Sequence, residues 1–180
     1  MKRWMFFLPL LAFCACQSPD DFMDRCTGRE LDTTTLEPCT DLLGHFSIPK
    51  PALWAGPFTE NNQDGNQLIL QDTARKVLLL ISEFEKVPDY KGWEQELAQI
   101  QAAFDVRDQG ETQVGGQPAN WCLMYDAPPE GQSSWSLFVS FDHPSDNRTY
   151  TATVRAPGRR SINERLCEVA PLLEGFKFLP

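Results

Sequence analysis

The sequence is poor in histidine and in basic residues, and both scarcities narrow the range of functions. Only two histidines, His45 and His143, occur in 180 residues. The short motifs of serine hydrolases, zinc proteases, phosphate-binding loops and dinucleotide-binding folds are all missing. Sixteen Lys and Arg stand against 25 Asp and Glu, which gives a formal net charge of -9. A surface this acidic repels phosphate backbones, so nucleic acid is not an expected partner.

Long apolar runs are also missing, and a short one stands at the start of the chain. Lys2 and Arg3 precede an uncharged, largely apolar stretch over residues 4–15. A transmembrane helix needs about 20 apolar residues, so this stretch is too short to span a bilayer stably. A positive start followed by a short apolar run is typical of a secretory signal peptide.

The end of this run resembles a bacterial lipobox, in which small residues precede an obligatory cysteine. The residues there are Phe13-Cys14-Ala15-Cys16. We therefore expect residues 1–15 to be a lipoprotein signal peptide and Cys16 to be acylated, with palmitate among its chains. Cys14 is the competing lipid site, and secretion with cleavage after Ala15 and no lipid is the alternative. Gln17 after the cysteine resembles the sorting pattern for the outer membrane, so we expect anchoring on its periplasmic face.

Four further cysteines remain, an even number in a compartment that favours disulfides. They are Cys26, Cys39, Cys122 and Cys167. Of the three possible connectivities we favour Cys26–Cys39 with Cys122–Cys167. A zinc site of four cysteines is the alternative, but no C-x-x-C pair occurs. We accordingly read residues 16–44 as a tether and a disulfide-closed lead-in.

Hydrophobic periodicity predicts a mixed domain over residues 45–180. Alternation of apolar and polar residues predicts strands at 134–142 and 148–155. Further strands are expected at 46–48, 67–71, 76–84, 119–125 and 176–178, with a short helix as the alternative for 76–84. An apolar stripe on a 3.6-residue period predicts a helix at 89–104. A second helix is expected to begin at Ser161, which forms a capping box with Glu164.

This order of elements resembles the PsbP-like fold group, which includes the Mog, PsbP and DcrB types of domain. The resemblance is carried by Phe46-Ser47-Ile48-Pro49 with Trp54, by Gly116-Gln117-Pro118-Ala119, and by the tail from Leu172 to Phe178. It implies an α+β fold, with an antiparallel β-sheet flanked by two main helices in a PsbP-like α/β sandwich. Members of the group mostly act as binding or accessory proteins, so the resemblance implies binding and carries over no catalytic residue.

Two clusters of polar residues are candidate sites. His143 lies between Asp142 and Asp146 in a polar segment, where a β-turn is favoured over a metal site or a Ser-His-Asp triad. The acidic and amide residues over 60–66 lack the spacing of a calcium loop and are favoured as a hairpin turn. We predict no catalytic residue, no cofactor and no metal. The candidate contact residues for a partner are Trp54, Phe58, Glu60 and Asp64.

The sequence therefore predicts a membrane-anchored periplasmic lipoprotein that acts as a non-catalytic module for protein binding. Its partner is expected to be a protein, and its contact with the membrane is expected to come from the acyl chains alone. One alternative is an immunity lipoprotein that neutralises a secreted toxin in the periplasm. A second is a carrier of a small apolar molecule in a cleft between helix and sheet. An enzyme built on His143 is the remaining alternative.

Overall fold

The structure is a computed structural model that describes residues 36–62, 65–127 and 132–180. Two helices, α1 (Trp93–Ala103) and α2 (Arg159–Glu174), accompany the strands of the described ranges. The strands are β1 (Leu36–Thr40), β2 (Phe46–Pro51), β3 (Ala55–Asn62), β4 (Gly65–Asp72), β5 (Val77–Glu85), β6 (Asp105–Val114), β7 (Gln117–Asp126), β8 (Ser134–Asp142), β9 (Arg148–Pro157) and β10 (Lys177–Phe178). Neither described helix is both long and apolar enough to cross a bilayer. The signal peptide, Cys16 and Cys26 lie outside the described residues.

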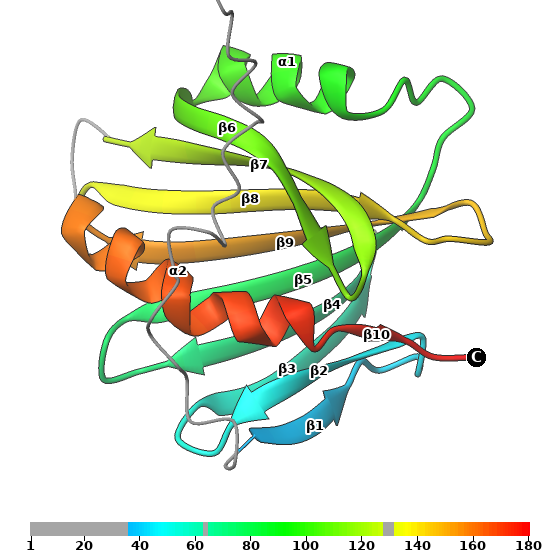
Figure 1. Cartoon of the computed structure of the whole chain (residues 1–180), viewed down its shortest axis with the longest axis horizontal. Helices are drawn as coiled ribbons and strands as arrows, with labels where there is room; N and C mark the ends of the chain where they lie inside the picture. The colour runs from blue at the N-terminus through cyan, green and yellow to red at the C-terminus, as the bar shows by residue number, and fades with distance from the viewer. Residues whose placement is uncertain (1–35, 63–64, 128–131) are drawn as a thin grey trace, which may run out of the picture.

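The strands form two antiparallel sheets. The larger has seven strands in the order β3-β4-β5-β9-β8-β7-β6, and the smaller has three in the order β1-β2-β10. Helix α2 runs across one face of the larger sheet, where it packs on β8 and β9 and contacts β2, whereas α1 lies near β6 (Figure 1). The expected α+β fold, an antiparallel sheet with two main helices, is confirmed.

The two faces of the larger sheet differ in how well they are covered. Because side chains alternate along a strand, each strand contributes every second residue to one face. The face under α2 is the main core, and its buried members include Leu79, Ile81, Leu137, Val154 and Trp121. The opposite face, which we call the outer face, carries Phe84 and Phe138, and α1 covers part of it through the stacked rings of Trp93 and Phe138.

An aromatic cluster joins the smaller sheet to the larger one. Phe176, just after α2, stacks on Phe46 of β2 with ring centroids 5.3 Å apart. The same ring meets Phe141 of β8 edge-on at 5.0 Å and Tyr150 of β9 at 5.7 Å. Phe178 of β10 extends the cluster, 5.2 Å from Tyr150. The closing Phe-x-Phe tail of the sequence therefore holds the two sheets together.

Three strands and the start of both helices differ from the sequence-based predictions. Strands β1, β3 and β6 were not predicted, and all three are edge strands with many exposed polar residues, so they lack the apolar signal of a buried strand. Helix α2 begins at Arg159 after Gly158, so Ser161 lies inside the helix and the predicted capping box was wrong. Helix α1 begins at Trp93, later than residue 89.

Candidate functional site

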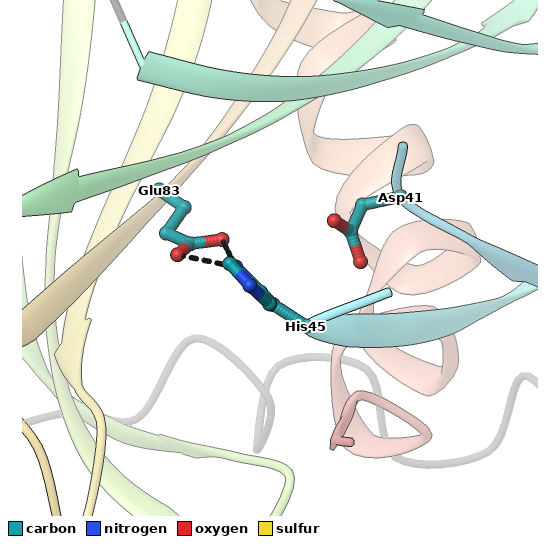
Figure 2. Close-up of side chains that lie close together, drawn as sticks. All are labelled: Asp41, His45 and Glu83. Carbon is teal, nitrogen blue, oxygen red and sulfur yellow. Dashed lines mark hydrogen bonds and ion pairs between the residues drawn. The ribbon is translucent and has the colours of Figure 1, made fainter. Parts of the chain in front are cut away.

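Polar side chains cluster where the two sheets meet, with two buried carboxylates and a partly exposed histidine. Asp41 follows β1, His45 precedes β2, and Glu83 lies on the core side of β5. The Nδ1 atom of His45 lies 2.8 Å from Oε1 and 3.0 Å from Oε2 of Glu83. Figure 2 shows the imidazole between the two carboxylates, with Glu83 on one side and Asp41 on the other. Since a carboxylate only accepts, Nδ1 carries the hydrogen in this contact.

Asn66 of β4 connects the two carboxylates directly. Its Nδ2 donates to Asp41 Oδ2 at 2.6 Å and to Glu83 Oε2 at 2.9 Å. Asp41 also accepts from two backbone amides, those of Leu43 at 2.9 Å and Phe46 at 2.7 Å. These bonds fix the β1–β2 loop against the end of the larger sheet.

Arg148 extends the cluster to the second histidine. Its Nη1 donates to Glu83 Oε1 at 2.9 Å, and its Nε donates to Asp146 Oδ2 at 2.6 Å. Asp146 Oδ1 lies 3.1 Å from Nδ1 of His143. Burial by itself would raise the pKa of Asp146, but hydrogen bonds from the side chain and backbone of Arg148 outweigh it and lower that pKa. The two histidines thus stand at opposite ends of one network of alternating charge.

The geometry of this network favours a structural role over metal binding. One ligand atom from each of Asp41, His45 and Glu83 lies within 4.8 Å of the others, which is compact enough for an ion. Yet the Glu83 carboxylate already accepts from His45, Asn66 and Arg148. A bound cation would have to displace these donors and would then sit beside the charge of Arg148. The Glu83 carboxylate is therefore satisfied by its neighbours in the network.

The His143 turn does not have the geometry of a catalytic triad. A triad needs the acid on one ring nitrogen and the nucleophile on the other. Here Ser145 Oγ, at 3.5 Å, and Asp146 Oδ1, at 3.1 Å, both approach the same Nδ1 atom. The backbone N–H of Ser145 also points at that atom, at 3.3 Å. The segment forms the connection between β8 and β9, in keeping with the favoured turn.

Of the predicted contact residues, two are exposed and one is buried. The Trp54 side chain packs in the core with 7% of its surface exposed, so its predicted role as a contact residue was wrong. The apolar neighbours that bury Trp54 are brought together only by the fold. Phe58 is 53% exposed on β3, and Glu60 is exposed on the same strand. Asp64 lies outside the described residues. Leu53, which was not predicted, is 95% exposed in the β2–β3 connection.

The cysteines do not form the predicted pairs. Cys39 and Cys122 are free and buried, so both expected disulfides were wrong. Cys39 donates its thiol hydrogen to the carbonyl of Ile48 at 3.2 Å, and burial raises its pKa to about 11. Cys122 lies on the outer face of β7, whereas α2 and its Cys167 cover the other face, so the sheet separates these two sulfurs. Cys167 itself is disulfide-bonded, and Cys26 lies outside the described residues.

A cavity of about 520 Å³ lies between α1 and the outer face of the larger sheet. Its walls come from β5, β8 and β9 below, from the β5–α1 connection at the side, and from α1 above. The apolar part of the wall consists of Phe84, Val87, Tyr90, Ile100, Phe104 and Phe138. Ligand pockets for small molecules have about 300–1,000 Å³ and a mainly apolar lining, so this cavity has the size and character of a binding site.

Sequence reasoning missed the polar network and the cavity. One signal for the network was visible, since Glu83 interrupts the apolar run of β5, and a charge there needs a buried partner. Its partners lie 17 to 65 positions away along the chain, at Asn66, His45 and Arg148, and no local pattern identifies them. Helix α1, above the cavity, was predicted from its stripe of apolar residues. The space between that helix and the sheet was not predicted.

Comparison with known proteins shows the fold and no closer relationship. No known family model matches the sequence, and no curated protein is significantly similar to it. The Ran-binding protein Mog1p of Saccharomyces cerevisiae aligns with a TM-score of 0.56 at 9% identity, over 79% of this chain and 95% of that protein. The cyanobacterial PsbP of Synechocystis sp. PCC 6803 aligns with a TM-score of 0.54 at 10% identity, over 85% of this chain and 96% of that protein. The chain therefore has a Mog1- and PsbP-like fold, as its sequence suggested.

Proposed function

We propose that this chain is a lipid-anchored, non-catalytic module of the bacterial envelope that binds another protein. The observation that carries the proposal is the exposure of large apolar side chains at Leu53 and Phe58, 95% and 53%. Both belong to the segment that leads into and along β3, an edge strand of the larger sheet. Exposed apolar residues grouped at one edge are typical of protein interaction sites. We call these two residues the β3-edge contact.

The polar network supports a binding protein over an enzyme. Within the described ranges both histidines are held by carboxylates, and their partners are fixed by further hydrogen bonds. His143 also lacks the arrangement of a triad base, because Ser145 and Asp146 approach the same ring nitrogen. The strongly acidic composition, with a formal net charge of -9, favours a basic protein as the partner through electrostatic steering.

Site-specific photo-crosslinking in the native envelope tests the β3-edge contact. A photoreactive amino acid at position 53 is expected to give one discrete crosslinked species with a partner protein. The substitution Phe58→Asp on the same chain is expected to abolish that species, because it places a charge in an apolar contact.

The matched control is the same photoreactive residue at Leu42. This leucine is 59% exposed but lies before β2, at the opposite end of that strand from Leu53. Equal crosslinking from both positions, or crosslinking from position 53 that Phe58→Asp leaves unchanged, would contradict the proposed contact.

Metabolic labelling tests the lipid anchor. Cells that express the chain and receive an alkyne fatty acid are expected to label it, and Cys16→Ser is expected to remove the label. The adjacent substitution Cys14→Ser is the control and is expected to leave labelling unchanged, since the expected cleavage precedes Cys16. Labelling that survives Cys16→Ser, or no labelling of the wild-type chain, refutes the anchor.

The cavity under α1 favours a second function, the carriage of a small apolar ligand. It lies on the outer face near α1 and does not include either residue of the β3-edge contact. The two functions are compatible, because a ligand under α1 leaves the β3 edge free.

A further inference from the structure

The cavity under α1 is open because the helix does not pack closely on the sheet. Helix α1 has an apolar stripe on the 3.6-residue period, yet none of its residues is fully buried. Phe104 at its end is 45% exposed and Val87 in the connection before it is 65% exposed, although both line the cavity. Apolar surface left in contact with water is stabilised by any apolar molecule that displaces the water. An occupant with an alkyl chain fits these walls.

One polar group in the wall has an unmet hydrogen bond. The Oε1 atom of Glu96 accepts from the Tyr90 hydroxyl at 2.8 Å. The other oxygen, Oε2, is buried, and no described residue donates to it. A buried acceptor without a donor is unfavourable, and more so when it carries charge. The occupant is therefore expected to bring an N–H or O–H group to this oxygen.

The charges around the cavity indicate whether the head group of the occupant should be positive or negative. Lys86, at the rim, is already paired with Asp142, with Nζ and Oδ2 2.8 Å apart. Burial, together with the charge of Glu96, raises the pKa of the Cys122 thiol to about 12. Burial, together with the hydrogen bond to Glu96, likewise raises the pKa of Tyr90 to about 12. Negative charge is thus disfavoured near Glu96, whereas an ammonium group would be favoured there.

We propose that this cavity binds a single-chain amphiphile whose head donates hydrogen bonds, an alkyl amine or alcohol, with the amine preferred. The chain lies against Phe84, Phe138 and Ile100, and the head donates to Oε2 of Glu96. This inference rests on the second function above, ligand carriage, and specifies which ligands are carried.

Calorimetric titration of the purified full chain tests the assignment. The probes are dodecylamine, dodecan-1-ol and dodecanoate, each below its micellar concentration at neutral pH. Dodecylamine is expected to bind at least about tenfold more tightly than dodecanoate, because only the amine forms a charge-assisted hydrogen bond with Glu96. The substitution Glu96→Gln is expected to weaken amine binding about tenfold and to change alcohol binding by less than about threefold.

Three further variants separate the contribution of the head group from that of the cavity itself. Glu94→Gln is the matched control, because Glu94 is exposed in the same first turn of α1 and does not line the cavity. It is expected to leave all affinities unchanged. Ile100→Trp fills the cavity and is expected to abolish binding of all three probes. Thr151→Phe, which fills it from the sheet, provides the same test if Ile100→Trp lowers the unfolding midpoint.

The outcomes distinguish the head-group assignment from ligand carriage. Equal affinity for all probes, preference for dodecanoate, or an unchanged amine affinity in Glu96→Gln would overturn the head-group assignment and leave carriage standing. If none of the three probes binds the wild-type chain, both the assignment and ligand carriage fail.

Discussion

Replacement of Arg148 by methionine is expected to lower the free energy of unfolding by about 3 kcal/mol. The Glu83 side chain is 7% exposed and forms an ion pair with Arg148, whose side chain is 23% exposed. Removal of one member of a buried ion pair typically lowers the free energy of unfolding by about 3–5 kcal/mol, because the other charge stays buried without compensation. We expect the lower end, since His45 and Asn66 still donate to Glu83. Urea unfolding followed by tryptophan fluorescence measures the change.

An exposed ion pair provides the control for this variant. Arg107 contacts Asp105 on β6, and both side chains are about half exposed. Arg107→Met is expected to change the free energy of unfolding by at most about 1 kcal/mol, as is usual for surface pairs. Equal effects of the two substitutions would show that Arg148 does not act through a buried charge.

The loss caused by Arg148→Met is expected to shrink in acid. Because Arg148 lowers the pKa of Asp146 in the folded chain, their contact stabilises the fold fully above the ordinary carboxyl pKa of about 4. This contribution disappears as the pH falls through the lowered pKa, because Asp146 then takes up a proton. The difference between wild type and variant should therefore decrease below about pH 4. A difference that stays constant from neutral pH to pH 3 contradicts this role of Asp146.

Replacement of Gly115 by alanine is expected to lower the free energy of unfolding by about 3 kcal/mol. Gly115 has φ +55° in the turn between β6 and β7, and its N–H donates to the carbonyl of Leu173 at 3.1 Å. A Cβ atom there would lie 2.4 Å from the carbonyl oxygen of Phe176. A positive φ costs alanine about 1–2 kcal/mol, and the steric conflict adds about as much again. The turn would have to move away from the end of α2.

The neighbouring Gly116 separates the cost of the positive φ from the cost of the steric conflict. Gly116 has φ +78°, but a Cβ atom there meets nothing within 4 Å. Gly116→Ala is therefore expected to cost only the conformational part, roughly 1–2 kcal/mol. Denaturant midpoints of the two variants, measured together, give the steric part by difference. If both variants lose the same stability, the close contact between Gly115 and Phe176 is not present in solution.

Local pattern predicted the centre of the fold well. The alternating segments at 134–142 and 148–155 are strands β8 and β9, because one face of each carries the apolar side chains of the main core and the other carries mostly serine and threonine. The Gly115-Gly116 pair forms the turn between β6 and β7. The edge strands escaped prediction because they are half paired and polar, so neither burial nor alternation marks them.

The site was less predictable, because its members come from distant parts of the chain. The β1–β2 loop, β4, β5 and β9 each supply one or two polar groups to the network around Glu83. Trp54 shows the same limit, since it was a candidate contact residue and the fold buries it. The predicted Cys122–Cys167 pair failed because position along the chain does not show which side of a sheet a thiol faces.

The sequence by itself determined the class of fold and the acidic character of the molecule, since periodicity and composition depend on the order and type of residues alone. The tertiary structure decided which charges are buried together, which thiols remain free, and that α1 leaves a cavity over the outer face. These features depend on distances between elements, and such distances follow from packing among residues that are far apart in the chain.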